Sequence, residues 1–138
     1  MPTDLSLEIR RAIVAHLRAD ATVTALVPAE RIYGEWPTVT DPDWPFIRMG
    51  YADAAAFEAT GWSGSESDFR IHIFANGPGT DAAMTIGKRV QRSMESFDPL
   101  SMDGCWSNWI RTNYMPDVVA GKIHGVLDFS VVGVEVTA

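Results

Sequence analysis

Cysteine is almost absent from this chain, since Cys105 is the single one among 138 residues. One cysteine excludes an internal disulfide and is typical of a protein from a reducing compartment. The three histidines, His16, His72 and His124, fall on three different expected elements, and no pair has the spacing of zinc ligands. We therefore expect no metal, no cofactor and no catalytic residue. A small enzyme or metal-site protein that uses Cys105 and His72 stays the alternative, because side chains can also meet through the fold.

Cationic residues are in the minority, with 11 lysines and arginines against 18 aspartates and glutamates and a formal net charge of -7. A protein that coats nucleic acid needs clustered Lys and Arg to neutralise phosphates, so this composition argues against that class. It does not exclude a protein past which DNA merely slides.

Long apolar runs are missing too. No uninterrupted stretch approaches the roughly 18 residues of a transmembrane helix, and the N-terminus lacks the basic and then apolar pattern of a signal peptide. We expect a soluble protein without membrane association that is not secreted by that route.

The sequence contains parts of two functional motifs, a phosphate-binding loop and a nucleophile elbow, but neither motif is complete. The pair Gly87-Lys88 follows a strand and a glycine-rich turn, yet a phosphate-binding loop needs glycine where Ala82 stands and Ser or Thr where Arg89 stands. Ser63 has Gly61 two residues before it, but a nucleophile elbow also needs glycine two residues after the serine, where Ser65 stands. Neither motif therefore predicts chemistry.

What the chain does contain is a clear strand, turn and helix between residues 67 and 97. Phe69, Ile71 and Ile73 alternate with polar residues, which predicts a half-buried strand. Asn76-Gly77-Pro78-Gly79 ends it, and the Thr80 side chain is expected to cap a helix. The inward stripe of that helix has helical spacing and consists of Ala83, Ile86, Val90, Met94 and Phe97.

The remaining elements follow from the same periods. Thr3 or Asp4 can cap a first helix with the apolar stripe Leu5, Ile9, Ile13 and Leu17. A short helical turn is expected at residues 20–27, and strands are expected at 31–34, 46–51, 106–115 and 123–136. In the second of these, Ile47, Met49 and Tyr51 should share one side. In the last, the apolar parity changes after Val131, which suggests a bulge near Gly133. The proline-rich residues 35–45 predict a packed connection.

These elements predict an α+β fold in a single domain, residues 1–138. We expect an antiparallel-rich mixed sheet of about five strands with two main helices packed on one face.

Two features predict contacts with other molecules. Ala52 to Glu66 reads as a long hairpin arm with two aromatic side chains, Phe57 and Trp62, that are costly to leave in water. We expect this arm to be mobile in an isolated subunit and ordered on assembly. Lys88, Arg89 and Arg92 form a basic patch on the second main helix, which is either a solvated face or a contact with an acidic region of another copy.

The order of the elements resembles the tail-completion family of long-tailed bacteriophages, prophages and gene-transfer agents. The resemblance spans nearly the whole chain and rests on collinear segments: Ala21 to Val27, Arg31-Ile32-Tyr33, Pro45-Phe46-Ile47, Ser65-Glu66 before Phe69 to Phe74, and His124 to Phe129. None of these is a catalytic motif. The tryptophans of residues 36–44 and Trp106-Trp109 depart from the family pattern.

The resemblance implies a virion structural protein made in the bacterial host cytoplasm. It would form a homo-oligomeric ring, a hexamer, at the head-proximal end of the tail tube, where it stops tube polymerisation and docks the tail to the capsid. Its partners would be the tail tube protein and the head-tail connector or stopper, with DNA passing through without sequence-specific binding. Other possibilities are another head-tail connector or a bacterial interaction module.

Overall fold

The computed structural model describes residues 3–35, 43–99 and 101–136. Helix α1 spans Ser6–Ala19, and the short helix α2 spans Ala21–Thr24. A 3-10 turn at Ala29–Arg31 leads into the two-residue strand β1, Ile32–Tyr33. The other elements are β2 (Phe46–Ala59), β3 (Trp62–Asn76), α3 (Asp81–Glu95), β4 (Gly104–Pro116) and β5 (Lys122–Val136).

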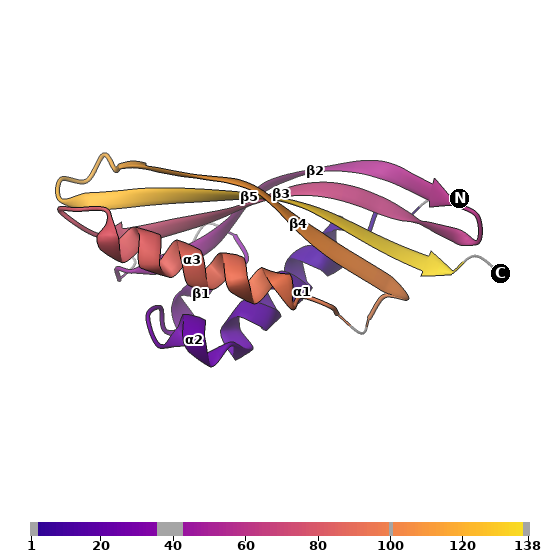
Figure 1. Ribbon diagram of the computed structural model, residues 1–138, viewed down its shortest axis with the longest axis horizontal. Helices are drawn as coiled ribbons and strands as arrows, with labels where there is room; N and C mark the ends of the chain where they lie inside the picture. Colours follow the sequence, from indigo (N-terminus) through magenta and orange to yellow (C-terminus); the bar gives the residue numbers. More distant parts are fainter. Residues whose placement is uncertain (1–2, 36–42, 100, 137–138) are drawn as a thin grey trace.

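All five strands form one sheet in the order β1-β2-β3-β5-β4. The β1–β2 pair is parallel and the other three pairs are antiparallel. Figure 1 shows the helices on one side of this sheet. The α+β class and the antiparallel-rich five-stranded sheet with helices on one face are therefore confirmed.

The core lies between the sheet and the helices. Both predicted stripes are fully buried there, from Leu5 to Leu17 on α1 and from Ala83 to Phe97 on and after α3. The odd-numbered residues Phe69, Ile71 and Ile73 of β3 join the same cluster. Because successive side chains of a strand point to opposite faces, the even-numbered residues of β3 lie on the face away from the helices, which we call the open face.

The helix starts differ in part from the expectation. The N-cap of α1 is Leu5, which has no capping side chain, and not the expected Thr3 or Asp4. Asp4 Oδ1 nevertheless accepts a hydrogen bond from the Ser6 amide at 2.8 Å. The amide of Leu5, one residue before Ser6, donates to Ser65 Oγ of β3 at 3.0 Å. The Thr80 side chain makes no capping hydrogen bond, so that prediction is wrong; Thr80 contributes its carbonyl oxygen, which accepts from the Met84 amide.

The predicted bulge near Gly133 is also wrong, because the β3–β5 register is continuous from Trp62 to Asn76. Irregularities lie instead in β4, between Trp109 and Arg111, and in β2, between Met49 and Ala52. The second one leaves Tyr51 exposed, so it does not share the buried side with Ile47 and Met49. The change of parity in β5 has another cause: Val131 faces the helices while Val132 and Val134 are buried on the open face.

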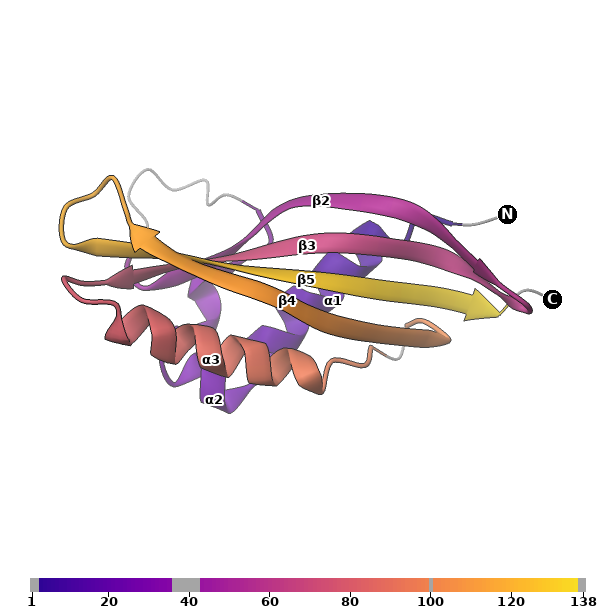
Figure 2. The same ribbon diagram turned by 45° about the horizontal axis from the view of Figure 1, so that its top comes forward.

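The arm predicted at Ala52 to Glu66 is a hairpin of regular strands, with β2 and β3 joined by a turn at residues 60–61. Figure 2 shows this turn and the end of β5 at one end of the elongated sheet, and the β4–β5 connection at the other. Of the proline-rich connection, residues 36–42 lie outside the described part. Trp44, just after them, packs edge-on against Phe46 and Phe74.

Candidate subunit interface

Three aromatic side chains gather on the open face near the tip of the arm: Phe57 from β2, Trp62 from β3 and Trp106 from β4. The strand register places them together. Phe57 lies opposite Gly64, and Gly104 lies in the same transverse row of the sheet. Trp62 is two residues from Gly64 along β3, and Trp106 is two residues from Gly104 along β4. The rings of Phe57 and Trp106 meet edge to face, with centroids 6.2 Å apart. We call these three residues the aromatic end.

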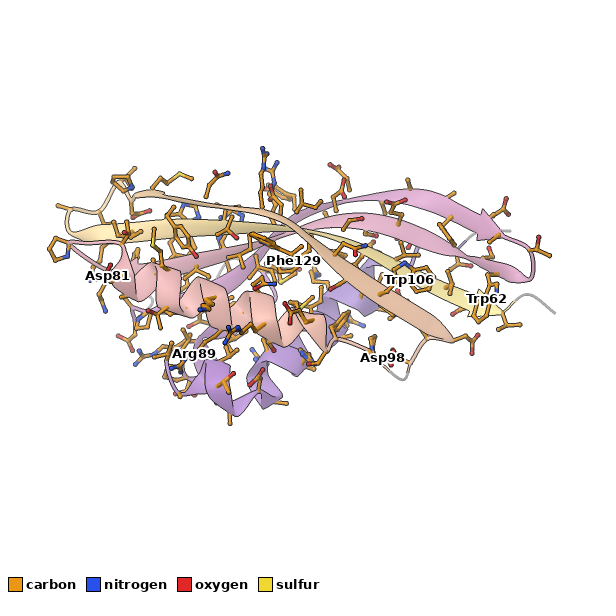
Figure 3. All side chains as sticks on the ribbon, viewed as in Figure 1. Trp62, Asp81, Arg89, Asp98, Trp106 and Phe129 are labelled. Carbon is orange, nitrogen blue, oxygen red and sulfur yellow. The ribbon has the colours of Figure 1, made fainter. Side chains whose placement is uncertain are left out.

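Glycine makes room for the tryptophan rings. A Cβ on Gly104 would lie 3.4 Å from Trp106 Cζ3 and 3.7 Å from Trp62 Cζ3, so both rings lean over a backbone without a side chain. Val132 and Val134 lie buried on this face. The rings themselves are not covered: Trp62 is 39% exposed and Trp106 is 47% exposed. Figure 3 shows both at the same end of the sheet. The result is an exposed apolar surface on a framework of paired strands.

The sheet around the aromatic end carries only negative charge. From Met49 to Phe69 the sequence has no lysine or arginine, but it has four exposed carboxylates: Asp53, Glu58, Glu66 and Asp68. On the other side of β3, residues 129–136 of β5 pair with it, and residues 104–110 of β4 pair with β5 in turn. These two segments also lack cations and add Glu135.

The basic patch lies in the other layer of the molecule. Lys88 and Arg92 are exposed and, with Arg89, line a shallow groove on α3 that also includes Asp81, Met84 and Thr85. We call this the α3 groove. Met84 is 47% exposed and gives the groove an apolar floor. Arg89 Nη1 donates to the carbonyl oxygen of Thr22 at 2.9 Å, so this arginine ties α2 to α3.

The predicted interface residues thus fall into two separate surfaces. Phe57 and Trp62 meet at the aromatic end, and Lys88, Arg89 and Arg92 meet in the α3 groove, but the two groups do not meet within one subunit (Figure 3). Sequence reasoning missed Trp106 as a member. Its strand was expected, but only the pairing of β4 with β5 shows that it shares a row with Val132 and Glu66.

The middle of the open face holds an ionic cluster around Asp128. Arg70 Nε lies 3.3 Å from one carboxylate oxygen of Asp128, and Arg111 Nε lies 2.9 Å from the other. Arg70 and Arg111 line a pocket on the open face together with Asp128, Asp53 and Asp68. Both arginines form their ion pairs with Asp128 and not with Asp53 or Asp68.

Farther from the aromatic end, the open face carries a histidine pair. His72 Nδ1 and His124 Nε2 are 2.7 Å apart, and the His124 ring stacks on Phe74 at 4.4 Å between centroids. Burial, together with the neighbouring Arg48 charge, lowers the pKa of His72 to about 4. Burial also lowers the pKa of His124. Both rings are therefore neutral near pH 7, and one can donate to the other.

Cys105 and His72 are not brought together. Cys105 lies opposite Gly133 and belongs to the helix-side core, while His72 lies opposite Val126 on the open face. Seven residues along β5 separate the two registers, roughly 23 Å. Burial raises the pKa of the Cys105 thiol to about 11, which opposes nucleophilic use. Among the described residues, no three His, Cys, Asp or Glu side chains cluster as a metal site, and no helix is long and apolar enough to cross a membrane.

Comparison with known proteins adds a family to this geometry. A family model described as tail completion protein gp17 matches residues 11–133. The chain belongs to the tail completion protein gp17 family. It is therefore a structural protein of the virion tail, as its resemblance predicted.

Among solved structures, a chain in the virion of a native gene transfer agent (GTA) particle has a similar fold. The TM-score is 0.72 at 20% sequence identity, and the match covers 91% of this chain and 94% of that one. The comparison with curated proteins found no match. The fold of this tail completion protein, with its sheet and helices, is thus shared with a virion component over nearly its full length.

Proposed function

We propose that this chain, acting as one subunit domain over residues 1–138, forms a closed ring of six copies on the head-proximal end of the tail tube. There it ends tube polymerisation and joins the tail to the capsid connector. Membership of the tail completion family carries this proposal. The six-membered ring, the position and the partners come from the family resemblance.

Two features of the subunit support a ring. The aromatic end stays partly exposed in a single copy, and a large aromatic side chain gains roughly 2 to 3 kcal/mol when buried, so a neighbouring copy can gain by covering it. The second surface, the α3 groove, is chemically unlike the first. A contact between two unlike surfaces that closes on itself makes a ring, whereas a self-complementary patch makes a dimer.

The partners follow from the position. One side of the ring would contact the tail tube protein and the other the head-tail connector or stopper. The net charge of -7 suits a passage through which DNA slides without binding, because the phosphates meet few clustered cations. We propose no turnover, no metal and no cofactor for this role.

Deletion of the gene in the producing strain tests the function. Without the chain, tubes should grow past their normal length and heads should stay unjoined, as counted in electron micrographs. Re-expression from a plasmid should restore joined particles, and images of these should show the chain as a closed terminal layer. Normal, joined tails in the deletion strain, or a terminal layer without this chain, would remove the proposed function.

A further inference from the structure

We propose that the acidic arm of one copy docks in the α3 groove of the next copy, with the aromatic end against Met84 and the arm carboxylates against Lys88 and Arg92. This contact is the head-to-tail interface of the ring, so the inference rests on the proposed function.

The first argument is the separation of charge within the subunit. Seven of the eleven lysines and arginines lie in α1, the 3-10 turn and α3, namely Arg10, Arg11, Arg18, Arg31, Lys88, Arg89 and Arg92. The arm half of the sheet has carboxylates and no cation. The same three elements also hold four carboxylates, Glu8, Glu30, Asp81 and Glu95, so seven cations against four carboxylates give them a net charge of +3, whereas the arm is purely acidic. Two copies gain favourable electrostatic energy when the acidic arm meets the cations of α3.

The second argument is the electrostatic cost already present in the arm. Asp53 and Asp68 are direct cross-strand partners, and like charges in that position destabilise a strand pair. Glu66 lies on the same face, two residues from Asp68. None of the ion pairs among the described residues includes one of these three carboxylates. A cation from another copy would relieve this repulsion.

The groove supplies what the arm lacks. Lys88 and Arg92 stand four residues apart on one side of α3, where two like charges slightly destabilise the helix. Met84 lies one turn before Lys88 and is exposed. An apolar floor beside two cations matches an apolar tip beside carboxylates, the arrangement of a hydrophobic interface core with a polar rim.

The contact must be between copies. The strand register places the aromatic end, Glu66 and Asp68 on the open face of the sheet, and the α3 groove is formed by exposed residues of α3. Figure 3 shows Trp62 and Trp106 on the sheet and Arg89 in the helix layer. The sheet and the core separate them within a subunit. Because the surfaces are unlike, each copy keeps one free arm and one free groove until the chain of contacts closes.

Two charge-reversal variants test the contact. The arm variant carries Glu66→Lys and Asp68→Lys, and the groove variant carries Lys88→Glu and Arg92→Glu. Arg89 is left in place because it binds Thr22. Assembly is measured by sedimentation velocity and native mass spectrometry. Each variant alone should assemble at least about tenfold more weakly than the unmodified chain, because like charges then face each other.

The mixture of the two variants gives the decisive result. The acidic arm of the groove variant fits the basic groove of the arm variant, and the basic arm of the arm variant fits the acidic groove of the groove variant. Mixing should therefore restore a closed ring with equal numbers of the two variants in alternation, which a six-membered ring permits. If the unmodified chain assembles only on tails, the same variants are scored by incorporation into particles, singly and co-expressed.

A control matched to the arm variant carries Glu8→Lys and Glu30→Lys, which change the net charge by the same amount at two exposed residues away from both surfaces. This variant should assemble like the unmodified chain. Thermal unfolding of every variant checks that the fold is intact, as expected for exposed positions.

The outcomes separate this contact from the proposed function. If the unmodified chain forms terminal rings and both variants still do so alone, the arm-to-groove contact is wrong and the function stands. If the mixture stops at one copy of each variant, the arms contact each other, which also overturns the proposal. If the unmodified chain is missing from tails, the proposed function itself fails.

Discussion

The two halves of the long strand β3 are buried by different means. Under the helices, Phe69, Ile71 and Ile73 fill the core with large side chains. In the arm, the same face of the strand carries Ser63, Ser65 and Ser67, which are buried as well. Large apolar side chains gain roughly 1.5 to 3 kcal/mol each on burial, whereas serine gains little. The half of β3 under the helices therefore adds more apolar burial to the subunit than the arm half does.

The arm shows the reverse pattern on its open face. There the large side chains are Phe57, Trp62 and Trp106. They lie on the side of the sheet away from the helices, which all pack against its other side (Figure 1). Its apolar surface is directed to solvent in a single copy. One end of the sheet thus has a core covered by helices, and the other end has aromatic side chains that stay partly exposed in a single copy. The following experiments test whether the two ends contribute differently to the subunit and to the proposed ring.

The largest expected effect on the subunit is in the covered half. Ile71 is fully buried beneath the helices, and Ile71→Ala should lower the free energy of unfolding of the monomer by about 2 to 5 kcal/mol through lost burial and a residual cavity. Chemical denaturation measures this. A loss below about 1 kcal/mol would mean that the helix-covered half does not carry the stability of the subunit.

Replacement of Gly64 should have the next largest effect. A Cβ at this position would lie 1.9 Å from the Gly133 carbonyl oxygen, so Gly64→Ala must push β3 and β5 apart. We expect a loss of about 1 to 3 kcal/mol in the same denaturation experiment. Gly79→Ala is a matched control, because a Cβ there meets nothing within 4 Å. Equal stabilities would show that the arm strands are not tightly paired.

Trp106→Ala tests the open face of the arm. With nearly half of the side chain exposed, the monomer should lose no more than about 1 kcal/mol, but ring assembly should weaken by about 2 kcal/mol or more because an aromatic anchor is lost. Denaturation of the monomer and sedimentation of the assembly give the two numbers. The reverse pattern, a destabilised monomer with unchanged assembly, would assign Trp106 to the subunit's own fold.

Hydrogen exchange sharpens the expectation of a mobile arm. Strand β3 is paired on both sides, but in the described part of the chain β1 pairs only with Ile47 and Arg48, which leaves the outer edge of residues 52–59 unpaired. We expect fast exchange at 52–59 and slow exchange at 62–76 in the monomer, with new protection at 52–59 on assembly. Equal protection of 52–59 in both states would leave nothing for assembly to order.

The smallest effect concerns pH. The folded-state pKa of His72, about 4, lies below the usual 6.5, so the unfolded chain binds the proton first. The stability that depends on neutral His72 is present above pH 6.5 and is lost as pH falls toward 4. The His72 imidazole is partly exposed, so we expect the free energy of unfolding to fall by only about 1 kcal/mol after solvent screening. In His72→Gln, the free energy of unfolding should depend less on pH between 6.5 and 4. An unchanged pH dependence would mean that other groups cause it.

Local patterns predicted most of the elements because each pattern reports one-sided burial. Leu5 to Leu17 and Ala83 to Phe97 face one core, so their helical period is regular and both stripes are buried as expected. Where both faces of a strand are covered, the period fails as a guide. The parity of Val132 and Val134 predicts a bulge because nothing in the sequence shows that both valines are buried on the open face, between β3 and β4.

The sequence by itself determined the helical stripes, the strand alternation, the missing cations between Met49 and Phe69, and the lack of a catalytic motif. These depend on neighbours along the chain. Only the tertiary structure decided that Trp106 joins Phe57 and Trp62, that Arg89 binds Thr22, and that Cys105 and His72 lie on opposite faces of the sheet. Those relations depend on strand order and register, which arise from long-range pairing that no local period encodes.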